Sequence, residues 1–521
     1  MASATLALEA YLGGAWVALT SDVILSSELN INYGISGAGP LDRIASSGTC
    51  TFTLNNSVTN SGTANGYYTP GHTNQKSNWE LGVLIRFHAT FGGTTYYKFY
   101  GTLVEVVPTA GSSRSRVVEC TAVDWMDEAA RSKVKNIDIQ TNRRSDLLAK
   151  ELVEESVSKQ PRAASYATGQ STFDFAFDNL ADAQTTVLRA LSDVVVSELG
   201  YLYVKGDTAG GGTLVFEDRH SRPKKGAASA TFNETMVSLN VSRSRGDLIN
   251  RVYVTVHPRT IAGSATALYE LTTTELSPEI PAGITVTLIA PFREASINAY
   301  RVAGQSLVTP VAGTDWIANT AADGSGSVIT SDVAVTLANT SANSVEFQVV
   351  NNGTVTAYLT TLQVRGTQVS DTTDTIMTAS DSASQTSYGE IDTRINMVYE
   401  SKAGEFGNLI AEWILNIYKD PRNVIQNMSI IANSSDALMT QALAREPGDK
   451  ITLTESMTAI AATGASGAEI GFFINGVSMT VQPGGIINTS WVLAPADQQA
   501  AWILNQVGAS ELGITTNLGF A

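Results

Sequence analysis

The sequence is short of charged residues: Asp, Glu, Lys and Arg make up 16% of its 521 residues, against about 25% in typical globular domains. Acidic residues outnumber basic ones by 49 to 33, so the formal net charge is −16. Binding along a phosphate backbone needs clustered Lys and Arg, so this balance argues against tight nucleic-acid binding. It would suit a surface that DNA passes without sticking, but from charge alone plain solubility is the favoured explanation.

Cysteine and histidine are also scarce. Cys50 and Cys120 are too few for a disulfide-rich module or a four-cysteine zinc site. Both lie in strand-like stretches, which favours buried free thiols and leaves a single bridge open. No pair of histidines has the spacing of a zinc site. The four histidines are His72, His88, His220 and His257.

Long apolar runs are missing as well. No run approaches 18 residues, so no membrane insertion is expected. The N-terminus lacks a basic region followed by an apolar run, so no signal peptide is expected. The sequence therefore predicts a protein that is made in a cytoplasm and is soluble there.

Catalytic signatures are equally sparse. There is no Gly-x-Ser-x-Gly elbow, and Gly210–Gly212 lacks the Lys-Ser/Thr of a phosphate loop, which favours a hairpin tip. Glu154 and Glu155 are interpreted as an exposed helix face. The spacing of Asp315, Asp323 and Asp332 is not that of an EF-hand loop. We therefore predict no catalytic, cofactor-binding or metal-binding residue, no cofactor and no enzymatic activity.

What the chain does contain is strand patterning, which fills residues 1–128. In 49–55, apolar and Thr residues alternate, and Phe91-Gly92-Gly93-Thr94 predicts a hairpin. The polar stretch 55–78, with Tyr67 and Tyr68, is a long loop of the kind that is often functional. The predicted strands are 15–25, 29–35, 49–55, 83–91, 95–107 and 116–123.

Residues 129–226 predict a helix, helix, hairpin module. A helix opens at Ser145 and carries Leu148, Leu152 and Val153 on one stripe. A second helix is predicted to begin at a cap, Asn179 or Asp182, and to stop at Gly200. The hairpin strands are 201–204 and 213–217.

Strands return after residue 227. A small sandwich is predicted over 292–366, with a hairpin at Asn351-Asn352-Gly353, and a polar loop over 369–387. A helix is predicted over 403–417, and its wide apolar stripe suggests that it packs against two elements, burying Trp413. The other predicted strands are 248–256, 284–289, 428–432, 450–453, 472–481 and 486–493.

The order of these parts resembles a known family. The phrases that carry the likeness are YKFYGTLVEV (97–106), RVVECTAVDWMDEA (116–129), the hairpin region 198–222, DLINRVYVTV (247–256), GNLIAEWIL (407–415), GDKITL (448–453) and FFINGVSMTV (472–481). In this order they resemble the tail hub, or baseplate hub or tail tip hub, of long-tailed phages, which is related to the base of type VI secretion spikes.

The resemblance implies a mainly β fold with a smaller α+β module: two β-barrel-like tail-hub domains, a helical and hairpin module and a small β-sandwich. The expected domains are 1–128 for the first barrel-like domain and 129–226 for the helix-helix-hairpin module. Residues 227–288 with 388–521 would form the second barrel-like domain, and 289–387 an inserted sandwich with a polar loop.

The resemblance also implies a function and partners. A homotrimer would close the distal end of a phage tail tube at the virion tail tip, after assembly in the host cytoplasm. It would bind the distal tail protein or tail tube protein above and tail fibre or tip proteins below. It would also hold the C-terminus of the tape measure protein and line a lumen through which DNA passes without specific binding. We expect the long loop 55–78 to pack on a neighbouring subunit or on the ring of the tail tube instead of its own barrel-like domain.

Two alternatives remain open at this point. One is a receptor-binding, adhesin-type tail protein whose sandwich binds host surface glycans. The other is a cell-wall hydrolase concealed in 129–225 or 292–366. The sequence ends at residue 521 without the lysozyme, peptidase or fibre-like extension of many family members, which lowers the expectation of cell-wall hydrolysis.

Overall fold

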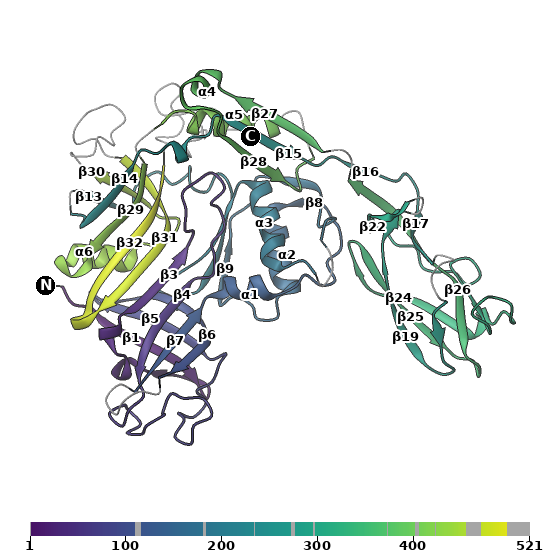
Figure 1. Ribbon diagram of the computed structural model, residues 1–521, viewed down its shortest axis with the longest axis horizontal. Coiled ribbons are helices and arrows are strands. Elements are labelled where there is room, and N and C mark those ends of the chain that lie inside the picture. Colours follow the sequence, from purple (N-terminus) through teal and green to yellow (C-terminus); the bar gives the residue numbers. More distant parts are fainter. Residues whose placement is uncertain are drawn as a thin grey trace.

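The computed structural model describes residues 2–109, 116–180, 184–233, 235–271, 277–294, 297–371, 374–401, 406–421, 424–454 and 470–496. In Figure 1 the first and last parts of the chain lie side by side on the left, and the helical module lies in the centre. A small sheet covered by a helix lies above the module, and a β-sandwich forms the far right of the molecule.

The N-terminal part forms seven strands of one large sheet. They are β1 (Thr5–Leu12), β2 (Ala15–Ala18), β3 (Leu29–Gly34), β4 (Thr49–Asn55), β5 (Leu84–Phe91), β6 (Thr94–Pro108) and β7 (Val117–Val123). The predicted alternation in β4 is confirmed, because Cys50, Phe52 and Leu54 are all buried in the main core. The hairpin at Phe91–Thr94 is also confirmed, as the turn between β5 and β6.

One strand prediction in this part is wrong at its end. The strand predicted over 15–25 stops at Ala18, and the chain turns there. The turn is held because the Thr20 hydroxyl oxygen accepts a hydrogen bond from the Leu8 backbone N–H at 3.0 Å, which returns the chain onto β1.

The C-terminal part contributes the rest of the same sheet. Its strands are β13 (Ala230–Asn233), β14 (Ser238–Ser242), β29 (Val424–Ile431), β30 (Lys450–Thr454), β31 (Ile470–Gln482) and β32 (Ile486–Pro495). Helix α6 (Asp436–Ala444) packs beside them. The strand order is β14-β29-β32-β31-β3-β4-β7-β6-β5-β1-β2, with β30 paired to β13 and β31. β3 therefore joins two parts of the chain that lie more than 400 residues apart in sequence.

The mainly β fold class with a smaller α+β module is confirmed. Within the described residues the strand pairing forms an open path between β14 and β2, and no closed barrel is detected. No helix in these ranges is long and apolar enough to cross a membrane.

The helical module lies beside the large sheet, in the centre of the molecule (Figure 1). It contains α1 (Trp125–Arg131), β8 (Gln140–Arg144), α2 (Ser145–Ser156), β9 (Ala163–Tyr166), β10 (Thr172–Ala176), α3 (Val187–Glu198), β11 (Tyr201–Lys205) and β12 (Thr213–Glu217). The predicted stripe of Leu148, Leu152 and Val153 on α2 is confirmed as buried. β11 and β12 form the predicted hairpin, and β9 pairs parallel to β12.

The predicted caps of the second helix are wrong. Thr186 caps α3, because its hydroxyl accepts a hydrogen bond from the Arg189 backbone N–H at 3.2 Å. Asn179 instead donates to Asp193, and Asp182 lies outside the described residues. The left-handed stop is Leu199, at φ 58°, one residue before the predicted Gly200.

Besides the main core of the large sheet and the core of the helical module, a third core lies between a small sheet and a helix. β15 (Arg251–Val256) pairs with β27 (Thr375–Ser380) and with β28 (Asp392–Met397). α5 (Phe406–Tyr418) covers this sheet and buries Ile410 and Ile414 against it. The predicted helix is thus confirmed from Phe406; its predicted start at 403–405 lies outside the described residues.

The polar loop predicted over 369–387 is wrong. Its described residues end the strand β26 (Ala357–Asp371), then form β27 and the helix α4 (Ser382–Tyr388). Asp381 caps α4 by accepting a hydrogen bond from the Ser384 N–H at 2.9 Å. The Ser- and Thr-rich composition reflects an edge strand with an exposed face, since alternate residues of β27 are exposed.

The remaining strands form a sandwich of two layers around Trp316, Phe347 and Leu359. One layer is β19 (Thr285–Pro291), β25 (Ser344–Asn351) and β24 (Val333–Ser341). In the other layer, β26 (Ala357–Asp371) pairs with β16 (Arg259–Ile261), β17 (Thr266–Glu270), β18 (Glu279–Ile280), β22 (Ala303–Gln305) and β23 (Trp316–Asn319). A separate hairpin joins β20 (Arg293–Glu294) to β21 (Ile297–Arg301).

The hairpin predicted at Asn351-Asn352-Gly353 is wrong. β25 and β26, on either side of it, belong to different layers and do not pair. The Asn351 amide donates to the carbonyls of Ile280 and Val355, and its oxygen accepts from the Gly353 N–H. The turn is therefore an arch that carries the chain from one layer to the other.

The long loop 55–78 packs on its own N-terminal strands, so the expectation that it packs on a neighbouring subunit or on the tube ring instead is wrong. Tyr68 is fully buried, and its hydroxyl donates to the Asp22 carboxylate at 2.6 Å. Trp79 closes the loop by donating to the Tyr68 carbonyl at 3.0 Å. These two aromatic rings belong to the main core and explain why the loop keeps a fixed path.

Candidate functional site

The residues considered for chemistry do not come together. His88 Nε2 lies 3.3 Å from a Glu9 carboxylate oxygen, and His257 Nδ1 lies 2.9 Å from Asp374, in a different part of the molecule. His72 is exposed in the long loop. Across the described ranges, no three His, Cys, Asp or Glu side chains are grouped as a metal site requires.

The acidic residues considered for calcium have structural partners. Asp315 is 2% exposed and accepts two hydrogen bonds from Arg365, at 2.7 and 2.9 Å. Asp323 accepts from Ser325 within its own turn. Glu154, on the exposed face of α2, lies 3.7 Å from Lys150. The thiols of Cys50 and Cys120 are free and buried, as predicted, and burial raises the pKa of both.

A cluster of buried polar side chains lies instead where the N-terminal strands, the helical module and the C-terminal part of the chain meet. The Glu446 carboxylate, just after α6, accepts hydrogen bonds from the Tyr33 hydroxyl at 2.8 Å and the Gly206 N–H at 3.0 Å. It also pairs with the buried ammonium of Lys98. Lys98 comes from β6, Tyr33 from β3 and Gly206 from the loop after β11. This cluster therefore joins the N-terminal and C-terminal parts of the chain to the helical module.

Burial raises the pKa of Glu446, while the Lys98 ammonium acts to lower it. Lys98 Nζ also donates to the carbonyls of Leu443 and Arg445, each at 3.1 Å. All of its donors are thus used inside the protein. A lysine so completely engaged is a structural element of the junction and not a base available for chemistry.

A second buried cation lies nearby. Arg222 is fully buried, and its Nε donates to Glu217 at 3.0 Å while Nη1 donates to Asn475 of β31 at 2.7 Å. Its guanidinium stacks 3.5 Å from the Tyr201 ring centroid. Burial acts to raise the pKa of Glu217, but Arg222 and Lys225 outweigh it and lower that pKa. The hairpin of the helical module is thus fixed to β31 by a paired charge.

A third buried carboxylate organises the module itself. Glu198, at the end of α3, accepts from the Ser145 hydroxyl at 2.8 Å, from the Ser171 N–H at 2.8 Å and from Arg219 at 3.3 Å. The Arg219 guanidinium also lies 4.9 Å from the Phe406 ring centroid of α5. The same cluster therefore ties the module to the helix of the third core.

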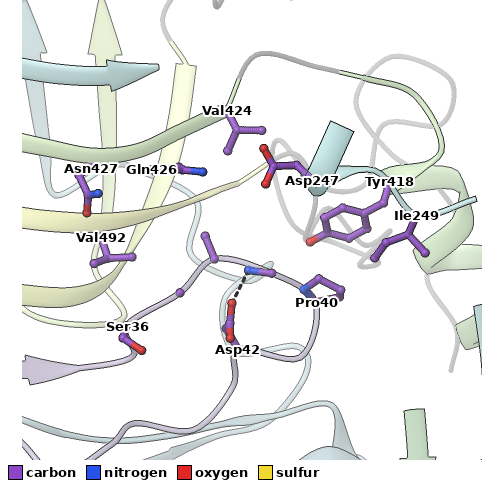
Figure 2. Close-up of a pocket in the computed structure, with 14 residues that line it drawn as sticks. Ser36, Pro40, Asp42, Asp247, Ile249, Tyr418, Val424, Gln426, Asn427 and Val492 are labelled. Atoms are coloured by element: carbon purple, nitrogen blue, oxygen red, sulfur yellow. Dashed lines mark hydrogen bonds between the residues drawn. The ribbon is translucent and has the colours of Figure 1, made fainter. Parts of the chain in front are cut away.

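A cavity of about 360 Å³ lies between the large sheet and the part of the chain that carries α5. Figure 2 shows it between the loop 36–42, the turn at Asp247, Tyr418 at the end of α5, and strands β29 and β32. The Asp42 carboxylate accepts a hydrogen bond from the Gly39 N–H at 2.8 Å and so shapes the loop. Its described lining is neutral and acidic and brings no nucleophile beside a base. The cavity marks a junction, and we assign no ligand to it.

An aromatic face on the outside of the N-terminal strands is the best candidate for an interface. Arg86 lies 4.0 Å from the Trp16 ring centroid and 2.6 Å from Glu9. Tyr11, which is 41% exposed, packs edge-on against Trp16, as does Tyr100. Tyr, Trp and Arg are the residues enriched in protein–protein interfaces. Sequence reasoning missed this face because its residues come from four strands.

Comparison with solved structures gives a consistent set of neighbours. A tail protein from Neisseria meningitidis MC58 is 8% identical with a TM-score of 0.44, and the match covers 94% of this chain and 96% of that one. The 43 kDa tail protein of prophage MuSo2 from Shewanella oneidensis is 10% identical with a TM-score of 0.45, covering 96% and 98%.

A third similar structure is an E. coli component of the type VI secretion system, described as structurally similar to the T4 tail proteins gp27 and gp5. It is 10% identical with a TM-score of 0.35, covering 91% of this chain and 73% of that one. No protein-family model matches the sequence, and no curated protein matches it. The chain is thus similar to phage tail proteins and to a type VI secretion component, the kinds of protein that its sequence resembles.

Proposed function

We propose that the chain is a structural protein of a phage tail: a homotrimeric hub that closes the distal end of the tail tube at the tip of the virion. The observation that carries this proposal is the pairing of β3 with both β4 and β31. It places the N-terminal and C-terminal β units in one sheet, with fixed relative positions.

Fixed positions matter for a ring. A chain that carries two β units in a single sheet presents both units in fixed relative positions at each step around a closed ring. Three copies then present six β units, which is the match to a sixfold tube that the family resemblance implies. The buried pairs Lys98–Glu446 and Arg222–Glu217 support the same role. Glu446 also accepts from the Gly206 N–H, and Arg222 donates to Asn475, so the helical module is held against the sheet.

The charge of the chain fits a conduit. With a net charge of −16 per copy, three copies in a ring carry a large negative charge, and a lumen lined by Asp and Glu repels phosphates. DNA would then pass without specific binding. The assembly would form in the host cytoplasm, and the role is structural and not enzymatic.

The partners follow from the position of a hub. The distal tail protein or tail tube protein would contact one face, fibre or tip proteins the other, and the tape measure C-terminus the lumen. The aromatic face around Tyr11, Trp16 and Tyr100 is the surface that we assign to one of these contacts or to the neighbouring subunit.

The domain division at 128, 226, 288 and 387 stays part of this proposal. The described cores add detail to it: Leu268 belongs to the core of the sandwich, and Val252 and Ile395 belong to the third core with α5. The inserted sandwich and this small core would then decorate the outside of the ring.

A cryo-electron microscopy map of the assembled tail tests the proposal. We expect three copies in a closed ring at the tip, with carboxylates facing the lumen. Six copies, or copies attached outside the tube as a spike, would contradict the hub. A monomer of the purified chain would not, because ring closure can depend on the neighbouring tail proteins.

A second candidate is a receptor-binding role for the sandwich. It lies at the far side of the molecule from the large sheet (Figure 1), and the outer face of its three-stranded layer carries exposed Thr285, Thr336 and Gln348. A glycan array probed with the full chain tests this role. Binding to host surface glycans would support it, and an array without signal would contradict it.

A further inference from the structure

The sandwich ends in an edge strand that is open to solvent. β19 pairs with β25 on one side, and no other strand in the described ranges pairs with it. Figure 1 shows β19 at the lower end of the sandwich, in the layer to the left of β26. An unpaired edge presents a row of backbone N–H and C=O groups to any extended chain that approaches it.

The side chains show that this edge is uncovered. Ile289 is 69% exposed, the largest exposure among the exposed large hydrophobic residues. Val286 and Leu288, which face the core, are only half-buried. In contrast, Val345 and Phe347 on the central strand β25 are at most 1% exposed. The core of the sandwich is therefore incomplete along β19.

Natural edge strands are normally protected by charges, bulges or prolines, and β19 has little such protection. Residues 281–291 (PAGITVTLIAP) contain no charged residue, and their prolines stand only at the two ends. The opposite edge of the same layer is different. β24 contains a register shift between Ala338 and Thr340, with Asn339 at φ 32°, and such a bulge disrupts further pairing.

We propose that β19 pairs with β19 of a second copy of this chain, antiparallel and about a two-fold axis at Thr287. In this register Val286 of each copy lies opposite Leu288 of the other, so the two half-buried core residues cover each other. Thr285 lies opposite Ile289 on the outer face. Pro291, which has no N–H, lies opposite Gly283 and ends the pairing.

Self-complementarity favours a second copy as the occupant, because the two-fold register sets each half-buried core residue opposite the other. The net charge of −16 per chain opposes contact between two copies. The segment 281–291 carries no charge, so this pairing brings no carboxylates face to face. The pairing is isologous and uses the sandwich instead of the large sheet, so it goes beyond the proposed ring. If each copy also belongs to a ring, the pairing would join two different rings.

The test is the oligomeric state of the full chain over a range of concentrations, by analytical ultracentrifugation. The wild type should dimerise reversibly. Thr287→Lys should raise the dimer Kd by about ten-fold or more, because the two lysines would lie directly opposite each other. Thr336→Lys is the matched control: Thr336 lies in the same row of the same face, two strands away, and should leave the Kd unchanged.

Register is tested by oxidation of single-cysteine variants. Thr287→Cys should form a disulfide between two copies, since antiparallel partners have Cα atoms about 4.5–5.5 Å apart. Ile289→Cys should not, because its partner is Thr285. A wild type that stays monomeric, equal effects of the two lysine variants, or a cross-link at 289 but not at 287 would each overturn the proposal. None of these outcomes bears on the hub, whose test is the tail map.

Discussion

Gly34 of β3 lies directly opposite Gly476 of β31, at the point where the N-terminal and C-terminal β units join. Gly34 has φ +91°, and a Cβ at this position would lie 2.5 Å from the Asn475 carbonyl oxygen and 2.9 Å from the Gly476 Cα. The two backbones approach so closely that only glycine fits, and the adjacent Asn475 carries the hydrogen bond to Arg222. The join between the two units is thus a site of backbone contact.

We expect Gly34→Ala to weaken this join. Gly14→Ala is the control, because Gly14 has nearly the same φ, +90°, but its Cβ would meet nothing within 4 Å. Both variants carry the strain of a left-handed alanine, and only Gly34→Ala adds a clash, of about 1–3 kcal/mol. Urea unfolding followed by tryptophan fluorescence should show the larger loss for Gly34→Ala. Equal losses would contradict the close contact.

Lys98→Met should destabilise the protein by about 3–5 kcal/mol, because it leaves the Glu446 carboxylate buried without its cation. Lys150→Met is the matched control, since Lys150 pairs with Glu154 on an exposed helix face and should matter little. Thermal melts of the two variants provide the measurement. Similar melting temperatures would show that the junction does not depend on this pair.

Local pattern predicted much of the secondary structure. Alternation in 49–55 and the Gly-Gly turn after Phe91 reproduce β4 and the β5–β6 hairpin, because both signals depend on near neighbours in sequence. The buried apolar stripe of α2 was predicted correctly for the same reason. The pairing of β3 with β31 could not be predicted this way, since nothing in either segment specifies a partner more than 400 residues away.

The wrong and missed predictions also come from contacts between residues that are distant in the sequence. Asn-Asn-Gly makes a tight turn in a hairpin or in an arch, and only the distant Ile280 carbonyl that Asn351 binds distinguishes them. Lys98 and Arg222 look like surface residues in sequence, and their burial depends on partners from other parts of the chain. The candidate interface around Trp16 was missed because it is assembled across strands.

Helix α5 offers a test of the third core. Ile414 is fully buried and Leu409 is 45% exposed on the same helix. Ile414→Ala should therefore cost about 2–5 kcal/mol, and Leu409→Ala less than about 1 kcal/mol. Trp413, expected from its sequence pattern to be buried, is half-buried and should fall between them. Urea unfolding of the three variants checks this order, and a larger loss for Leu409→Ala would contradict the orientation of the helix.

The last prediction concerns Asp124, the cap of α1. One of its carboxylate oxygens accepts a hydrogen bond from the Met126 N–H at 3.0 Å, and the side chain is buried. Burial raises the pKa of Asp124 to about 7, above its ordinary value of 3.8. Because the folded state holds the proton more tightly, the contribution of Asp124 to stability is fully present below about pH 4 and is lost as the pH rises toward 7.

Asp124→Asn should remove this pH dependence while keeping the cap, since an amide oxygen also accepts a hydrogen bond from the Met126 N–H. The free energy of unfolding of the wild type should fall relative to that of the variant by up to about 1.4 kcal/mol per pH unit between about pH 4 and 7. Asp127→Asn is the control, because Asp127 is more exposed and pairs with Arg131 at 2.8 Å. Unfolding curves at pH 5 and pH 8 provide the comparison. Parallel pH profiles for the wild type and Asp124→Asn would show that this carboxyl group is ionised in the folded protein at both values.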